Sequence, residues 1–290
     1  MILDISSLIP ATSFLFYVAF TVFGFSQRRT QRVRLSFLSY MAAMSVWSLG
    51  SFLMHADTGL FTPLLWNRVM MVGLLAVPIT VYHSLIDFTS SKRRSRVVLL
   101  VVGYAIYGFL LFLNFRGSIV ADAGFVGDVF YYSLGPSAIT AYVLSYAFLI
   151  MAIVLVSREL ALADNSVERK RLVPLLAGGI VLLLGVLVNV DERIGRYPID
   201  LVAATINGLL VFYSVYKYRL VSYSQLFLKS IVYFLLIVVS ALVFAGILQL
   251  ALPSSIQSSF QNRYLISLLV ATVAALIFQP IRHGAVRIFG

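Results

Sequence analysis

Polar side chains inside otherwise apolar segments are the residues of this sequence that could recognise a small molecule. Amide, hydroxyl, indole and guanidinium groups supply the few directional contacts that orient a ligand in an apolar cavity. We predict a ligand-binding site drawn from eight such residues: Trp47, Trp66, Arg68, Tyr142, Tyr146, Asn189, Asp200 and Asn207.

The spacing of these residues groups some of them on common helix faces. Tyr142 and Tyr146 are one helical turn apart, and Asp200 and Asn207 are separated by seven residues, about two turns. Arg68 could pair with Asp57, with Asp200 or with a carboxylate on the ligand, because a guanidinium group matches carboxylate geometry.

The same residues have a structural interpretation that the sequence leaves open. Tryptophan and tyrosine near the ends of apolar segments anchor a helix at the membrane surface. Asparagine and serine within such segments join helices by hydrogen bonds, alongside small residues such as Gly178 and Gly185.

Other chemistry finds little support. His83 and Asp87 are four residues apart, which places them on one helix face either as a proton switch or as an ordinary hydrogen-bonded pair. The chain has no cysteine, no Gly-rich phosphate loop and no HExxH or zinc-ligand spacing. We therefore predict no catalytic residue, no metal and no cofactor. A retinal Schiff base also lacks its lysine, since Lys217 comes only at the end of the seventh apolar segment.

Composition indicates which solvent surrounds the chain. Hydrophobic residues make up 61% of it and charged residues only 11%, whereas a soluble domain carries about 25% charged residues. We expect a lipid bilayer as the main partner. The net charge of +11 is assigned to basic loops at the membrane and not to nucleic-acid binding.

Nine segments are long and apolar enough to span a membrane, so the predicted fold is an all-α, polytopic helical bundle. A spanning helix needs about 20 mostly apolar residues. The segments are 8–26, 35–54, 69–88, 97–113, 133–156, 172–190, 200–216, 230–251 and 264–280.

Basic residues orient this bundle. With the N-terminus outside and the C-terminus inside, 17 of the 22 lysines and arginines fall on the cytoplasmic side, as the positive-inside rule requires. The longest outer connection, residues 114–132, is expected to be a small cap or a flexible lid. We divide the chain into a seven-helix sensor bundle (1–220), two additional transmembrane helices (221–280) and the start of a cytoplasmic signalling linker (281–290).

Several short motifs follow one another in a familiar order. They are Ser45-Val-Trp-Ser-Leu-Gly50, Leu65-Trp-Asn-Arg68, the exit sequence Tyr216-Lys-Tyr-Arg-Leu220 and Phe278-Gln-Pro-Ile-Arg282. Together they resemble the seven-helix N-terminal sensor region of bacterial membrane histidine kinases, in a nine-helix variant similar to quorum-sensing kinases that bind small acylated signals.

The resemblance implies a multi-pass sensor in the bacterial cytoplasmic (inner) membrane. It would detect a small, lipophilic, extracytoplasmic or membrane-borne signal and relay it, within a homodimer, to a cytoplasmic kinase or another output module. No kinase domain lies within the 290 residues, and we expect a truncated sensor whose linker begins near Pro280. Pro78, Pro136 and Pro174 are expected to bend helices and provide alternative packings.

Three other functions remain open. A transporter or channel for a small solute would need internal repeats or carboxylates at mid-membrane, and the nearest carboxylates, Asp87 and Asp200, lie at the ends of apolar segments. A membrane assembly subunit would use the polar groups for packing alone. A sensor could also drive a different output, such as a cyclic-dinucleotide synthase.

Overall fold

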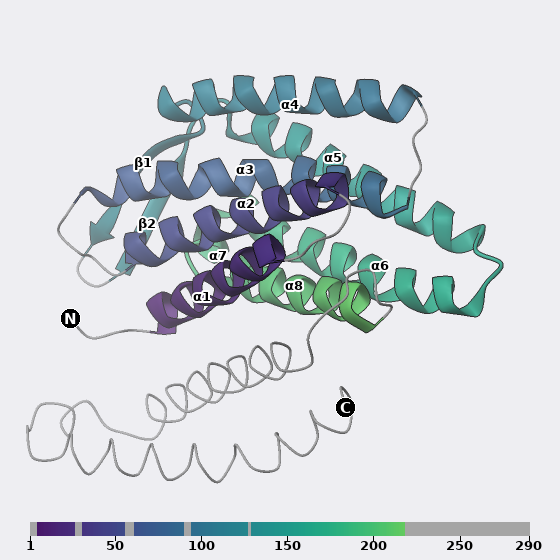
Figure 1. Cartoon of the computed structure of the whole chain (residues 1–290). Helices are drawn as coiled ribbons and strands as arrows, with labels where there is room; N and C mark the ends of the chain where they lie inside the picture. Colours follow the sequence, from purple (N-terminus) through teal and green to yellow (C-terminus); the bar gives the residue numbers. More distant parts are fainter. Residues whose placement is uncertain (1–4, 27–30, 56–60, 90–93, 127–128, 218–290) are drawn as a thin grey trace, which may run out of the picture. The chain divides into compact units, whose positions relative to one another are not determined.

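The computed structural model describes residues 5–26, 31–55, 61–89, 94–126 and 129–217, which belong to one compact unit, Met1–Ser222. Within them the chain forms seven long helices (Figure 1): α1 (Ile5–Ser26), α2 (Gln31–His55), α3 (Pro63–Phe88), α4 (Arg94–Phe115), α5 (Ala138–Ala161), α6 (Ser166–Leu187) and α8 (Ile199–Lys217). The predicted eighth and ninth segments and the linker lie outside the described residues.

Each of the first seven predicted segments coincides with one of these helices. Five helices are long and apolar enough to cross a membrane, and two shorter apolar helices, Ser7–Thr21 and Ile199–Ser214, accompany them. The described part of the chain is therefore a polytopic membrane helical bundle, as predicted.

Most helix boundaries differ from the predicted ones by one to six residues, and the starts of the third and fifth helices show why. The third helix begins at Pro63, because the Thr62 side chain caps it by accepting from the Leu65 amide and proline suits the first helical turn. The fifth helix begins only at Ala138. Pro136 therefore precedes α5, and the prediction that it bends a helix was wrong; Pro78 and Pro174 do lie inside helices.

A β-hairpin joins α4 to α5, which the all-α prediction missed. Strands β1 (Val120–Val126) and β2 (Val129–Leu134) pair antiparallel, with Gly124 opposite Tyr131. Aromatic and β-branched residues in β2 favour an extended strand. The segment predicted as a cap is thus an ordered hairpin that packs against α3. We call this side of the bundle the hairpin end.

Six helices pack in a closed circuit, in the order α1, α2, α3, α5, α6, α8 and back to α1. Helix α4 lies outside this circuit against α3 and α5 (Figure 1). The spanning part of α3 is 78% buried and that of α4 only 17% buried, so α3 belongs to the core and α4 presents most of its surface to lipid. Gly73 allows the close approach of α3 to α2, since a Cβ there would lie 2.3 Å from the Trp47 backbone nitrogen.

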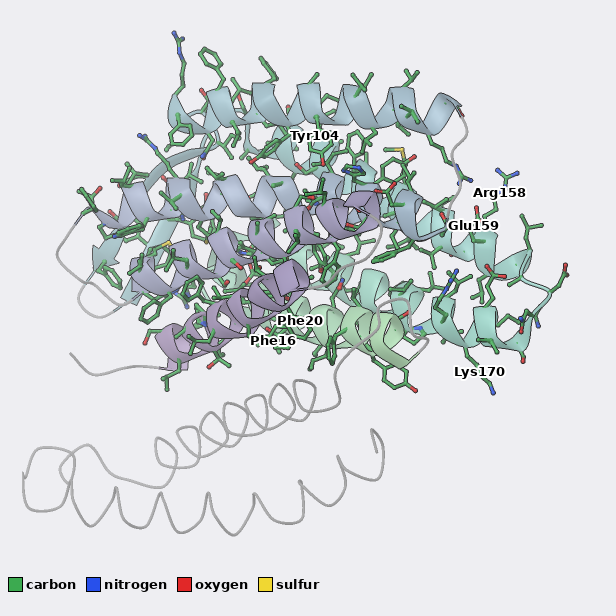
Figure 2. All side chains as sticks on the ribbon, viewed as in Figure 1. Phe16, Phe20, Tyr104, Arg158, Glu159 and Lys170 are labelled. Atoms are coloured by element: carbon green, nitrogen blue, oxygen red, sulfur yellow. The ribbon has the colours of Figure 1, made fainter. Side chains whose placement is uncertain are left out.

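Aromatic packing and charge distinguish the interior from the ends. Phe16 and Phe20 of α1 are buried, and the Phe20 ring lies 4.5 Å from the Phe212 ring of α8 (Figure 2). Arg158, Glu159 and Lys170 gather at the end of the bundle opposite the hairpin, where Arg96 forms an ion pair of 3.3 Å with Glu159 (Figure 2). We call this the basic end.

Candidate functional site

A small cavity with both polar and apolar lining residues lies beneath the hairpin. Its polar lining residues come from α2, α3, β2, α5, the 3-10 turn η1 (Val188–Val190) and α8: they are Ser51, His55, Asn67, Tyr132, Tyr142, Asn189 and Asp200. The cavity has a volume of about 20 Å³ for the centres of water-sized molecules. That is enough for a water or an ion, and well below the few hundred Å³ of a typical ligand pocket. We call it the hairpin-end cavity.

The negative group of this cavity is Asp200, which is only 6% exposed. Its Oδ2 accepts from Asn189 Nδ2 at 2.9 Å, and its Oδ1 accepts from the Leu201 amide at 2.8 Å. Asp200 is the second residue of α8, where the positive end of the helix dipole favours a carboxylate. No described residue forms an ion pair with it.

Two hydrogen bonds latch the hairpin over the cavity. The Tyr132 hydroxyl donates to the Asn189 carbonyl at 3.2 Å, and the Leu134 amide donates to Glu192 Oε1 at 2.7 Å. Burial, together with the carboxylates of Asp200, Glu192 and Asp191, raises the pKa of Tyr132 well above its usual value. Tyr132 is therefore a neutral donor at physiological pH, and the latch does not titrate through it. Glu192 begins the short helix α7 (Glu192–Gly195).

His55 closes the cavity at the end of α2. Its Nδ1 lies 2.8 Å from the Ser51 carbonyl, its Nε2 lies 3.4 Å from the Arg196 carbonyl, and its ring centroid lies 5.0 Å from that of Phe130. A carbonyl oxygen only accepts, and a neutral imidazole donates from one nitrogen only, so a neutral ring can make one of these two contacts as a hydrogen bond. His55 thereby connects α2 with the hairpin and with the segment after α7.

Several buried polar atoms of the start of α3 and the end of α4 have no hydrogen-bond partner among the described residues. They are Trp66 Nε1, Asn67 Oδ1, Arg68 Nε and Asn114 Oδ1. The Asn67 amide nitrogen makes only a 3.4 Å contact to Met54 Sδ. A buried polar atom without a partner costs about 1–3 kcal/mol, so such a concentration at one end of a bundle indicates a functional region.

The predicted site residues separate into two groups. Tyr142, Asn189 and Asp200 line the hairpin-end cavity. Tyr146 lies next to it: its ring stacks on Tyr142 at 5.7 Å and its hydroxyl donates to the Val186 carbonyl at 2.6 Å.

The hairpin-end cavity is not lined by Arg68, Trp66 or Trp47. The Arg68 guanidinium lies against Gly117, where a Cβ would come within 3.0 Å of Nη2, and it forms no ion pair with Asp200. Asp57, its other predicted partner, lies outside the described residues. Trp47 is fully buried and its Nε1 has no partner.

Asn207 belongs to a second polar cluster in the interior of the bundle. Its Oδ1 accepts from the Tyr40 hydroxyl at 3.0 Å and its Nδ2 donates to the Gly178 carbonyl at 3.2 Å. These bonds join α2, α6 and α8, and both functional groups of the amide are satisfied. We call Tyr40, Gly178 and Asn207 the three-helix cluster.

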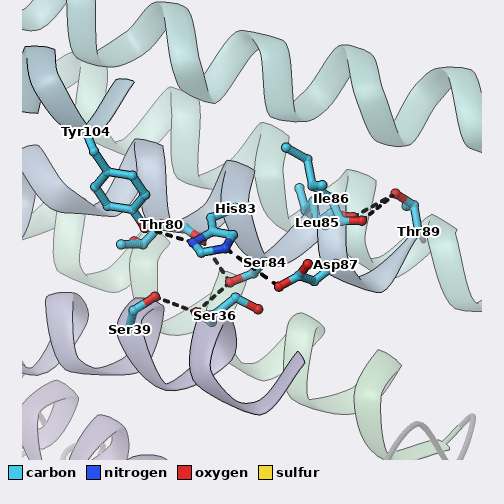
Figure 3. A network of polar contacts seen from close by, with 10 residues as sticks. All are labelled: Ser36, Ser39, Thr80, His83, Ser84, Leu85, Ile86, Asp87, Thr89 and Tyr104. Carbon is cyan, nitrogen blue, oxygen red and sulfur yellow. Dashed lines mark hydrogen bonds and ion pairs between the residues drawn. The ribbon is translucent and has the colours of Figure 1, made fainter. Parts of the chain in front are cut away.

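The predicted His83–Asp87 pair forms near the basic end (Figure 3). His83 Nε2 lies 3.7 Å from Asp87 Oδ2, and His83 Nδ1 lies 2.9 Å from the Tyr104 hydroxyl of α4. Below it, Ser84 donates to the Ser36 carbonyl at 2.9 Å and so ties α3 to α2. These contacts join three helices and leave the choice between a proton switch and a structural pair open.

Five polar residues of these sites were not predicted from the sequence: Tyr40, Ser51, His55, Asn67 and Tyr132. Asn67 could have been found from the sequence, because it stands between Trp66 and Arg68, which were both predicted as site residues. Tyr132 was placed in a loop, and only its alternation with Phe130 along a strand could have indicated an inward side chain.

The chain was also compared with known proteins. The family model of the N-terminal 7TM region of histidine kinases matches residues 7–224, which is most of the chain. The match covers the six helices of the circuit and helix α4. No curated protein and no solved structure was found to match. The predicted resemblance is confirmed, and the chain belongs to the family of N-terminal seven-transmembrane regions of histidine kinases.

Proposed function

We propose that this chain is the signal-sensing input region of a two-component histidine kinase and that its signal acts at the hairpin-end cavity. The family match, which implies a membrane sensor and a cytoplasmic output module, carries the proposal. The signal is a small, lipophilic, extracytoplasmic or membrane-borne molecule of the quorum-sensing type. The sensor acts as a homodimer in the bacterial inner membrane.

The proposed topology has nine spans, with the N-terminus outside and the C-terminus inside. The distribution of 17 of the 22 basic residues supports this orientation. It places the hairpin outside and the basic end in the cytoplasm. In this arrangement residues 1–220 sense the signal, residues 221–280 add two spans, and residues 281–290 begin the output linker.

The size of the cavity constrains how a lipophilic signal could enter. A volume of about 20 Å³ cannot hold an acyl chain. Signal binding must therefore break the latch, meaning the Tyr132–Asn189 and Leu134–Glu192 hydrogen bonds. The latched hairpin is one state, and an opened hairpin with the signal beneath it is the other.

The opened state changes the packing of the helices that hold the cavity. Residues of α3, α5 and α8 line it directly, and η1 extends α6 to it. The signal shifts the balance of the two states only by the ratio of its affinities for them. The two C-terminal spans relay that shift toward the cytoplasmic output near Pro280.

Orientation can be tested on single-cysteine variants, because the chain has no native cysteine. Val126, in the hairpin, is 72% exposed, and Val167, at the start of α6, is 55% exposed. A membrane-impermeant maleimide is expected to label Val126→Cys in intact cells and Val167→Cys only after lysis. The opposite labelling pattern would reverse the orientation and place the cavity in the cytoplasm.

Signal recognition can be tested with a series of radiolabelled acyl amides on the chain in nanodiscs. Asn189→Ala is expected to weaken binding of the best probe by about tenfold, since it removes a cavity amide and a partner of Asp200. Unchanged affinity in Arg68→Ala would remove Arg68 from the site. Uptake of the probe into proteoliposomes, without saturable binding, would instead favour a transporter.

A further inference from the structure

Two acceptor groups of the hairpin-end cavity have unfilled hydrogen-bonding capacity. Asp200 offers two carboxylate oxygens, each of which receives one hydrogen bond. Asn67 is only 2% exposed, and its Oδ1 receives no hydrogen bond from the described residues. A carboxylate oxygen accepts about two hydrogen bonds and an amide oxygen also two. Both groups can therefore accept a further hydrogen bond or bind a cation.

The charge of Asp200 is likewise unbalanced by the described residues. Its contacts are the Asn189 amide and the Leu201 backbone, both neutral. An uncompensated carboxylate inside a membrane bundle is expensive and marks a functional site. The positive end of α8 offsets this charge only in part, because it carries about half an elementary charge, and a bound cation would complete the compensation.

The volume and the chemistry of the lining restrict what can supply that charge. A space of about 20 Å³ admits a body of the size of a water molecule and excludes organic ammonium ions. Carboxylate and amide oxygens are the ligands of hard cations. One carboxylate balances one positive charge, which favours a monovalent over a divalent ion.

The surrounding backbone suits a cation as well. The turn η1 continues the C-terminal end of α6 into the cavity, and that end is the negative pole of the helix dipole. Interrupted helix ends combined with a carboxylate are a recurrent way of holding small monovalent cations in membrane proteins.

We propose that the hairpin-end cavity binds a small monovalent cation of the Na⁺ class between Asp200 and Asn67. The ion joins α8 to α3 beneath the hairpin and so stabilises the latched state. The inference does not rest on the proposed sensor role, since the purified chain without any kinase is expected to bind the ion.

The test compares thermal unfolding of the chain in nanodiscs of zwitterionic lipid in sodium chloride and in choline chloride of equal ionic strength. Both salts are used at the same pH, so that the protonation state of the chain does not differ between the two measurements. Sodium is expected to raise the Tm of the wild type by roughly 3 °C relative to choline, by preferential binding to the folded state. Equal Tm values in the two salts would overturn the proposal and leave the cavity with water only.

Variants locate the effect. Asp200→Asn is expected to lose the sodium shift while its Tm in choline equals or exceeds that of the wild type. Glu168→Gln, which removes an exposed carboxylate at the basic end, is the matched control and is expected to keep the shift. A sodium shift that survives in Asp200→Asn would contradict the assignment.

A direct binding measurement covers the case in which Asp200→Asn fails to fold. Radioactive sodium is expected to bind the wild type saturably and to bind Asn67→Leu about tenfold more weakly. Equal binding by the two proteins would exclude Asn67 as a ligand and overturn the site. If acyl probes bind while sodium does not, the cation site fails and the sensor proposal stands. If sodium binds while no acyl probe does, the cation site stands and the proposed signal site fails.

Discussion

The three-helix cluster and the hairpin-end cavity are both built around a buried asparagine, and they differ in how far their polar groups are satisfied. Asn207 and Asn67 are each only 2% exposed. Asn207 uses both ends of its amide, toward Tyr40 and Gly178, whereas the Asn67 Oδ1 has no partner.

This difference separates structural from functional polarity in one bundle. A buried polar network whose hydrogen bonds are all made stiffens the packing. A network with unmade hydrogen bonds costs stability, and a protein keeps such a network where a ligand or ion supplies the missing partners. We therefore assign the three-helix cluster to holding α2, α6 and α8 together, and the hairpin-end cavity to binding.

The largest effect is expected from removing the amide of the three-helix cluster. Asn207→Leu deletes two interhelical hydrogen bonds and leaves the buried Tyr40 hydroxyl without its acceptor. We expect a loss of about 2 kcal/mol in stability and a fall in Tm of roughly 4–8 °C, read by thermal unfolding in nanodiscs. A variant with the Tm of the wild type would break the comparison.

A smaller effect is expected from removing one donor of the same cluster. Tyr40→Phe leaves the Asn207 Oδ1 without its hydrogen bond, at a cost of about 1 kcal/mol. Tyr197→Phe is the matched control, because Tyr197 is 50% exposed. Its substitution is expected to leave the free energy of unfolding within about 0.5 kcal/mol of that of the wild type. Equal losses in both variants would show that the cluster contributes nothing specific.

The latch of the hairpin should affect local opening more than global stability. Glu192→Ala removes the acceptor of the Leu134 amide, and this contact is exposed. The variant is therefore expected to lose less than about 1 kcal/mol in free energy of unfolding. Hydrogen exchange of the hairpin amides is expected to accelerate by about threefold or more, while exchange in α3 is unchanged. Uniform acceleration across the bundle would show that the latch is part of the core.

The sequence predicted the helices well because their signal is local. Apolar length without charge placed all seven described helices, since lipid tolerates no other arrangement of the backbone. Boundaries depended on caps and turns: the Thr62 cap lengthened α3, and the Gly135-Pro136 turn delayed α5. The hairpin escaped because its strands are short and the helix pattern around them dominates.

The site was only partly predictable because satisfaction of polar groups is a tertiary property. The position of Asn207 and Asp200 on one helix suggested a common site, but the structure places Asp200 in the hairpin-end cavity and Asn207, about two turns away, in the three-helix cluster. Nothing in the sequence around Asn207 shows that Tyr40, 167 residues away, donates to it. Tyr132 reaches the cavity through the hairpin, which the sequence did not indicate, and His55 reaches it from the end of α2.

The most direct test applies one substitution to both asparagines. Asn67→Leu and Asn207→Leu are unfolded thermally in choline chloride, so that cation binding contributes to neither Tm. The account expects Asn67→Leu to stay within about 0.5 kcal/mol of wild type, because it loses one weak contact to Met54, while Asn207→Leu loses about 2 kcal/mol. Equal destabilisation, or a larger loss in Asn67→Leu, would contradict the assignment of the two clusters.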